Sequence, residues 1–279
     1  MFNSIRCVNY LPWRESFLGW FLGAYTHSIT ESGRSSIVPQ GPYHYGVEYL
    51  AVHARVNRDK AQKLLPGFLR STDEAWFYVA DFVTVHGSNV DWIYRLPDMT
   101  QYREAAIALK VIYSGKTYSY FPFMWVDKDW ALIRGWLNGY PKKIAEIVMS
   151  RINPLNPALS SVSKGTKLGG YCSRLGRRLL TLTVEIEEET RDIPIRGFGP
   201  TLTYRHFPIT YDGQQGVSEV LEIIRSNYKL GSAYKGKGEV EIGYSENDEV
   251  ELIEITSILG GYYYIAGYTI EGGKVIGRH

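Results

Sequence analysis

Alternating, strand-like segments constrain the fold of this chain more than any other feature. Apolar side chains occupy every second position from Leu180 to Ile186, and residues 76–86 (WFYVADFVTVH) form an almost unbroken run of aromatic and β-branched residues. Further runs of this kind cover 43–53, 105–113, 117–126, 168–172, 200–209, 239–244, 250–255 and 262–270. Each of these segments is predicted to be a β-strand, and the short turn Ser114-Gly115-Lys116 predicts a hairpin between two of them.

Helix signals are few and short. Asn57 is an expected N-cap for a helix over 58–65, Asn138-Gly139 is expected to end a helix over 130–137, and another short helix is expected over 142–152. The glycines of 231–238 indicate a turn. We therefore predict an α+β fold that is mainly antiparallel β, with a barrel-like or strongly curved sheet and peripheral short helices. Residues 1–279 are expected to form a single domain, in which 1–35 are an irregular or partly helical N-terminal arm.

Composition excludes several classes of function. The 31 Lys and Arg are scattered among 29 acidic residues, giving a net charge of +2, so we expect no nucleic-acid partner. The six His and two Cys form no metal-ligand motif, no phosphate-binding or dinucleotide-binding motif is present, and we expect neither a metal nor an organic cofactor. No cleavable leader is evident and the apolar run 17–25 is too short to span a bilayer, which predicts a cytoplasmic protein without membrane contact.

The segment Gly139-Tyr140-Pro141-Lys142-Lys143 is the strongest chemical signal in the chain. A lysine amine must be neutral to attack a carbonyl, yet its ordinary pKa is ~10.4. Burial among apolar groups and a neighbouring cation both lower that pKa. Aromatic residues beside Lys142 and the adjacent Lys143 supply both conditions, although a Lys-Lys pair taken alone is usually solvated.

Several motifs in the same order resemble the acetoacetate decarboxylase family over most of the chain. They are GYPKK at 139–143, GPY at 41–43 followed by Glu48-Tyr49, Tyr102-Arg103-Glu104-Ala105, GKGEV at 236–240 and LGGYYY at 259–264. Acetoacetate decarboxylase is itself an established example of a lysine activated beside another cation. The resemblance therefore implies a Schiff-base nucleophile at Lys142, with Lys143 as the cation that lowers its pKa. It also implies that Glu104 is the acid/base carboxylate.

The resemblance assigns substrate-binding roles to four further residues. Tyr102 is expected to supply a pocket hydroxyl, and Asp81 lies close to a second family carboxylate, within an apolar strand where a lone charge is costly. Asn138 and Arg134 are expected to contact the substrate. Each has a purely structural alternative: Tyr102 packs in the core, Asp81 faces solvent on an edge strand, Asn138 caps a helix and Arg134 lies on a helix surface. From the residues alone, Glu104 is an exposed carboxylate paired with Arg103.

Two departures from the decarboxylase pattern leave the reaction open. Val47 stands where the decarboxylase has an arginine, and an apolar side chain cannot replace a guanidinium. The segment Arg134 to Asn138 resembles instead the aldolase-dehydratase subgroup, with Asn138 in place of a glutamine.

Three functions follow for this scaffold. The first, which we expect, is a Schiff-base lyase that decarboxylates a β-keto acid through Lys142, and the other two are alternatives to it. The second is a pyruvate-dependent aldolase-dehydratase on the same scaffold. The third is a noncatalytic small-molecule binder with an aromatic-lined pocket, which the 22 Tyr and 7 Trp would supply. The expected partner is a small keto-acid substrate, and the resemblance implies a homo-oligomer.

Overall fold

The computed structural model describes residues 24–87, 89–213 and 215–279, and the chain divides into two compact units, residues 1–39 and 40–279. Within the first unit, residues 24–39 form turns without helix or strand. Thr26 Oγ1 donates a hydrogen bond to the Val38 carbonyl at 3.0 Å, and Ile37 N donates to His27 O at 2.9 Å. The predicted arm over 1–35 lies mainly in residues 1–23, outside the described residues.

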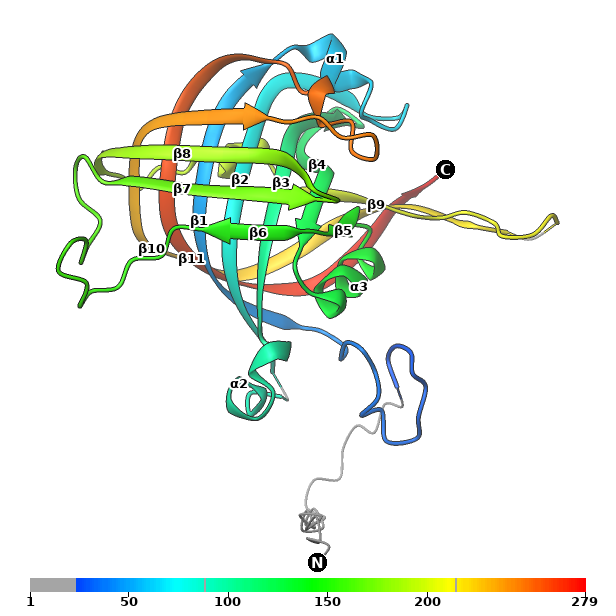
Figure 1. Cartoon of the computed structure of the whole chain (residues 1–279). Coiled ribbons are helices and arrows are strands. Elements are labelled where there is room, and N and C mark those ends of the chain that lie inside the picture. Colours follow the sequence, from blue (N-terminus) through cyan, green and yellow to red (C-terminus); the bar gives the residue numbers. More distant parts are fainter. Residues whose placement is uncertain (1–23, 88, 214) are drawn as a thin grey trace, which may run out of the picture. The chain divides into compact units, whose positions relative to one another are not determined.

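The second unit is built on a single 11-stranded sheet with short helices at its edges (Figure 1). Its strands are β1 (Tyr43–Val56), β2 (Arg70–His86), β3 (Gln101–Tyr113), β4 (Lys116–Val126), β5 (Lys142–Ile144), β6 (Glu146–Met149), β7 (Lys167–Arg174), β8 (Arg177–Glu189), β9 (Thr201–Phe207), β10 (Val217–Ile242) and β11 (Ile255–Arg278). Its helices are α1 (Arg58–Gln62), α2 (Trp92–Arg95), α3 (Asp129–Leu137) and the 3₁₀ turns η1 (Pro97–Met99), η2 (Pro194–Phe198) and η3 (Val250–Leu252).

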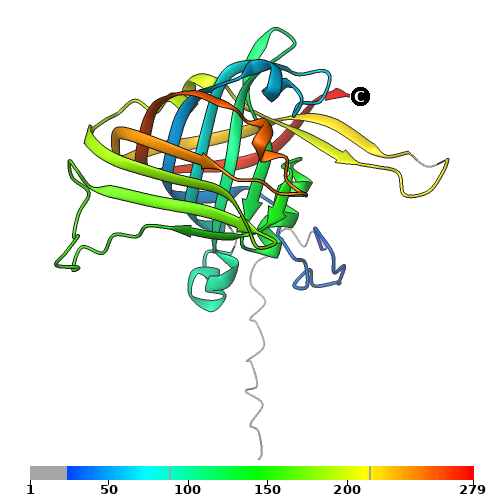
Figure 2. The same cartoon turned by 45° about the horizontal axis from the view of Figure 1, so that its top comes forward.

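The strand order is β11-β1-β2-β3-β4-β9-β10-β8-β7-β6, with β5 paired to β4. Because β10 also pairs with β11, the sheet closes on itself, and the long strands bend around the ring in both views (Figures 1 and 2). Most pairs are antiparallel; β5 and β9 run parallel to β4. The prediction of a mainly antiparallel, strongly curved sheet with peripheral short helices is confirmed.

Three local predictions are wrong. Residues 142–152 contain strands β5 and β6 in place of a helix, because Lys142 to Ile144 pair in parallel with β4. Residues 250–255 begin with the 3₁₀ turn η3, and the predicted turn over 231–238 lies within β10. A Cβ at Gly236 would come within 1.9 Å of the Glu185 carbonyl oxygen, so this glycine allows close approach of β8 and β10.

The alternation of side chains along each strand separates two faces of the curved sheet. On β2, Phe77 and Val79 join the hydrophobic core cluster, together with residues of β3 and β8. Tyr78 and Phe82, one step out of phase, line a cavity on the other face. One face of the sheet therefore packs in the hydrophobic core, and the other face lines the cavity.

Candidate active site

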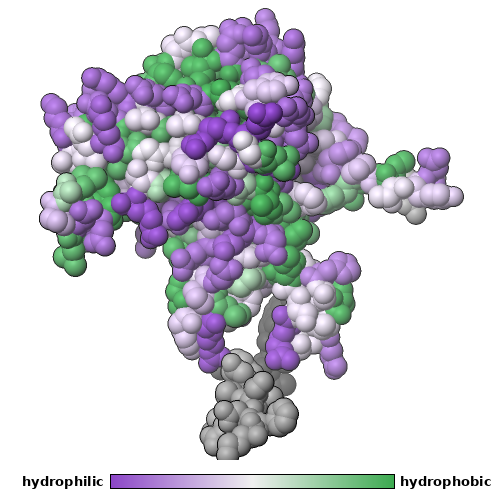
Figure 3. Space-filling model, viewed as in Figure 1, coloured by the Kyte–Doolittle hydropathy of each residue, from purple (hydrophilic) through white to green (hydrophobic). Residues whose placement is uncertain are grey.

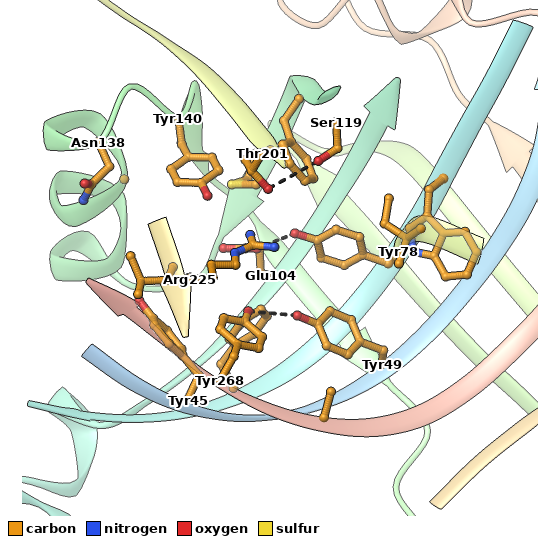
Figure 4. Close-up of a pocket in the computed structure, with 18 of the residues that line it drawn as sticks. Tyr45, Tyr49, Tyr78, Glu104, Ser119, Asn138, Tyr140, Thr201, Arg225 and Tyr268 are labelled. Atoms are coloured by element: carbon orange, nitrogen blue, oxygen red, sulfur yellow. Dashed lines mark hydrogen bonds between the residues drawn. The ribbon is translucent and has the colours of Figure 1, made fainter. Parts of the chain in front are cut away.

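A cavity of about 200 Å³ lies on the second face, and tyrosines supply much of its wall. The tyrosines are Tyr43, Tyr45, Tyr49, Tyr78, Tyr102, Tyr140, Tyr228, Tyr264 and Tyr268. They come from β1, β2, β3, β10, β11 and the segment after α3, so the closed sheet is what brings them together. In Figure 4 the hydroxyls of Tyr49, Tyr78 and Tyr140 point into the space around Glu104.

Lys142 reaches this cavity because α3 ends in a tight, well-defined turn. Tyr140 N donates to Gly135 O and Gly139 N donates to Trp136 O, each at 3.0 Å, which is the Schellman pattern of a helix C-terminus. Gly139 has a φ of 77°, in the left-handed region that favours glycine. Pro141 follows, which cannot continue a helix, and Lys142 then pairs with Met124 of β4.

The stem of Lys142 lies directly against Gly135 of α3. A Cβ at Gly135 would fall 2.3 Å from Lys142 Cδ and 2.8 Å from both Cγ and Cε. The absence of a side chain at this helix position therefore makes room for the lysine. The indole of Trp136 also holds the segment, since its Nε1 donates to Lys142 O at 2.8 Å.

Lys142 and Glu104 form a buried ion pair. Lys142 Nζ lies 2.7 Å from Glu104 Oε2, and the two side chains are 7% and 5% exposed. Glu104 belongs to β3 and Lys142 to β5, with β4 between them, and both side chains point to the cavity face. The Tyr78 hydroxyl donates to the other carboxylate oxygen, Oε1, at 2.5 Å (Figure 4). The alternative of an exposed Glu104 paired with Arg103 is wrong.

Burial lowers the pKa of Lys142 below its ordinary value. Glu104 opposes this change because its charge favours the ammonium form, while the Arg134 guanidinium lowers the pKa further. The result is a lysine that gives up its proton more readily than a solvated one. A carboxylate at hydrogen-bond distance is placed to accept that proton.

Lys143 lies on the opposite face from Lys142. Consecutive strand residues point to opposite sides of a sheet, and Lys143 Nζ donates to the buried carboxylate of Asp248 at 2.8 Å and to Asn247 O at 2.6 Å. Lys143 is absent from the described residues that line the cavity, whereas Arg134 is present. The structure therefore places Arg134 in the position of the pKa-lowering cation that the sequence assigned to Lys143.

Arg134 is buried in a cage of aromatic rings on the cavity wall. Its Cζ lies 4.8 Å from the Tyr43 ring centroid, 4.9 Å from Trp130, 5.2 Å from Tyr45 and 5.5 Å from Tyr102. Nη1 donates to Thr84 Oγ1 at 3.4 Å, while Nη2 is buried without a hydrogen-bond partner. A buried donor without a partner is costly, so Nη2 is suited to an anionic ligand. The alternative of a surface arginine is wrong.

The other predicted binding residues divide into two groups. Tyr102 and Asn138 line the cavity, and the Asn138 amide also caps α3 by donating to Arg134 O at 3.0 Å. Asp81 does not line this cavity, because it precedes Phe82 on β2 and therefore points to the opposite face of the sheet. Its Oδ2 lies 3.7 Å from Arg103 Nε. Asp81 lines a separate, more open depression with residues 97, 98, 101–103, 127, 128 and 151.

Sequence reasoning missed Arg225 of β10, Ser119 of β4 and Thr201 of β9, all of which line the cavity. Ser119 Oγ and Thr201 Oγ1 lie 3.3 Å apart, and Arg225 Cζ lies 5.1 Å from the Tyr268 ring centroid. None of the three belongs to a recognisable motif. The alternating pattern of β10 was the available signal for Arg225, and it is broken by irregular pairing with β11 between Ile224 and Arg225.

Comparison with known proteins assigns the family. The family model described as acetoacetate decarboxylase matches residues 26–279. The chain belongs to the acetoacetate decarboxylase family. An acetoacetate decarboxylase-like enzyme from Sphingomonas wittichii RW1 has 31% sequence identity to this family member and a TM-score of 0.86, over 92% of this chain and 100% of the other.

Two further solved structures share the fold with lower identity. The enduracididine biosynthesis enzyme MppR, complexed with the condensation product of pyruvate and imidazole 4-carboxaldehyde, has 23% identity and a TM-score of 0.83, over 90% of this chain and 95% of that one. The acetoacetate decarboxylase from Legionella pneumophila has 17% identity and a TM-score of 0.71, over 86% and 89% of the two chains. A search of curated protein sequences finds no match to this family member.

Metal-binding clusters and membrane-spanning helices are both absent from the part of the chain that the structure describes. Within 24–87, 89–213 and 215–279, no three His, Cys, Asp or Glu side chains gather in an arrangement that would hold a metal ion. In the same ranges no helix has the length and apolar character needed to cross a membrane.

Proposed function

We propose that this family member is a Schiff-base lyase acting on a small keto acid through Lys142. The buried Lys142–Glu104 pair at 2.7 Å carries the proposal, because it joins a lysine of lowered pKa to a carboxylate in a cavity. Transfer of the ammonium proton to Glu104 leaves a neutral amine. That amine attacks the substrate carbonyl carbon to give a carbinolamine. Glu104 returns the proton to the carbinolamine hydroxyl, which leaves as water, so that a protonated imine forms and Glu104 is a carboxylate again.

Arg134 favours a substrate whose carboxylate is retained. Its buried, unpartnered Nη2 lies on the wall that also carries Lys142, so a 2-oxo acid can place its carboxylate there and its carbonyl at the amine. A guanidinium that stabilises a carboxylate opposes its departure as carbon dioxide, since the charge would have to move away from the cation. We therefore propose the aldol branch: Glu104 removes a proton from the carbon next to the imine, and the resulting enamine attacks an aldehyde.

The tyrosines support the later steps of this branch. Burial raises the pKa of Tyr45, Tyr49, Tyr78 and Tyr102, so these hydroxyls remain protonated at neutral pH and act as donors. A protonated hydroxyl can donate to the alkoxide that forms on the aldehyde oxygen. Loss of that oxygen as water then gives the unsaturated product, and hydrolysis of the imine frees Lys142.

Decarboxylation of a β-keto acid is the second candidate, favoured by the family match over residues 26–279. The imine would then act as the electron sink as carbon dioxide leaves. Val47 remains the feature that separates this chain from that reaction, because it is 2% exposed and supplies no charge where the decarboxylase has an arginine.

Two measurements on one sample separate these reactions. Exchange of the pyruvate methyl protons for deuterium, followed by NMR, reports enamine formation, and carbon dioxide release from acetoacetate reports decarboxylation. The proposal predicts exchange with pyruvate that is lost in Lys142→Ala and retained in Lys110→Ala, a lysine outside the cavity. Carbon dioxide release without methyl exchange would favour decarboxylation. Neither reaction, with ligand binding that survives Lys142→Ala, would favour the noncatalytic binder.

A homo-oligomer and a cytoplasmic location remain predictions. The hairpin between β9 and β10 projects from the sheet (Figure 1), and Phe207, Ile209, Tyr211 and Val217 are exposed on it. Hydrophobic residues reach the surface on this hairpin and at other places on the face in Figure 3. Such side chains are suited to a contact between copies, which sedimentation of the wild type and of Tyr211→Ser would test. A monomer at micromolar concentration would contradict the prediction.

A further inference from the structure

The cavity wall carries more positive than negative charge. Among the described residues that line it, Arg134, Arg196 and Arg225 are basic besides Lys142, and Glu104 is the sole acidic residue. Transfer of the Lys142 proton to Glu104 neutralises both groups and leaves the three guanidiniums as the charged groups among these residues. The wall therefore attracts anions, and a single substrate carboxylate can match only one of these positive charges.

Arg134 and Arg225 approach the cavity from different elements. Tyr45 and Tyr268 stack with ring centroids 5.3 Å apart. Arg134 Cζ lies 5.2 Å from the Tyr45 centroid, and Arg225 Cζ lies 5.1 Å from the Tyr268 centroid. Each guanidinium thus contacts one ring of a stacked pair. The two cations are held at separate places on the wall.

The two arginines also have different relations to the nucleophile. Arg134 belongs to α3 and influences the charge of Lys142 directly. Arg225 belongs to β10 and lines the cavity together with Tyr140, two residues before Lys142. The Arg225 side chain is also partly exposed to solvent, whereas Arg134 is buried. Two such cations can hold the two ends of one extended anion.

We infer that the substrates in this cavity carry a second carboxylate, which Arg225 binds while Arg134 binds the first. The inference rests on the proposed function for the position of the reacting carbonyl, between the two ends. The second carboxylate can belong to the keto acid itself or to the aldehyde that the enamine attacks. Both sources present the same chemistry to Arg225.

Binding of unreactive acids tests the inference without any chemical step. Titration calorimetry would compare glutarate, which has two carboxylates, with pentanoate, which has the same chain length and one carboxylate. We expect glutarate to bind at least about fivefold more tightly, because Arg225 adds a charged hydrogen bond that solvent partly screens. Arg225→Gln should reduce this ratio to near one, and Arg225→Lys should retain part of it. Arg58→Gln removes the same charge from exposed helix α1 and should preserve the ratio.

Trapping experiments then identify the source of the second carboxylate. Borohydride reduction with 2-oxoglutarate and with 2-oxobutanoate tests the donor, and condensation of pyruvate with succinic semialdehyde and with butanal tests the acceptor. A preference for the carboxylated compound in either pair, lost in Arg225→Gln, is expected. Equal binding of glutarate and pentanoate, no measurable glutarate binding, or a ratio that Arg225→Gln leaves intact would overturn the inference. Absence of every adduct despite a clear glutarate preference would instead count against the proposed function.

Discussion

Substitution of Gly135 by alanine tests how closely the fold positions the nucleophile. The new Cβ would lie 2.3 Å from Lys142 Cδ, about 1 Å inside the 3.4 Å at which ordinary contact begins. The stem of Lys142 must therefore move, and the 2.7 Å contact with Glu104 moves with it. A displacement of about 1 Å at a reacting group costs about 100-fold in rate, so we expect a loss of that size.

Stability should change far less than rate in this variant. Alanine in place of glycine stabilises a helix by up to ~1 kcal/mol, while overpacking costs ~1–3 kcal/mol, so the two effects largely cancel. The assay is the rate of pyruvate-dependent adduct formation at Lys142 under borohydride, with the free energy of unfolding measured in urea. Gly67→Ala is the matched control, since no atom lies within 4 Å of its added Cβ. A folded Gly135→Ala protein that forms the adduct within threefold of the wild-type rate would refute this reasoning.

Two further predictions concern the cations near the nucleophile. Burial and Arg134 both lower the pKa of Lys142, so Arg134→Gln should raise that pKa and move the acid limb of the adduct-formation rate to higher pH. A pH profile of trapping checks this, and an unmoved limb would contradict it. Lys143→Gln should leave the limb in place, because its side chain faces Asp248 away from the cavity. The same change should lower the free energy of unfolding by about 2 kcal/mol in urea titrations, since buried Asp248 loses a hydrogen-bonded cation; full stability would argue against that contact.

Strand alternation predicted the fold because it is a local property of the sequence. The runs around β1 to β4 and β8 coincide with strands, and Asn57 and Asn138-Gly139 bound α1 and α3 as expected. Prediction from local sequence was wrong where pairing with neighbouring strands determines the secondary structure. Lys142 to Met149 have no strong periodicity, and their extended form follows from the neighbouring strands β4 and β7.

Residues of the candidate site could be predicted from the sequence only where they belong to a recognisable motif. Lys142 and Glu104 stand in recognisable segments, and their meeting at 2.7 Å agrees with the roles implied by the family resemblance. The adjacency of Lys143 in sequence suggested adjacency in space, but β5 is a strand and strand neighbours point apart. The contributions of Arg134 and Arg225 depend on closure of the sheet, which no single segment encodes.

Reduction of the enzyme with borohydride in the presence of ¹³C-labelled pyruvate, followed by peptide mapping, tests the central claim most directly. The structure predicts one labelled adduct on Lys142, and none on that peptide in Lys142→Ala. An adduct on Lys143 or on another lysine, or pyruvate turnover that persists in Lys142→Ala, would contradict the assignment of Lys142 as the nucleophile.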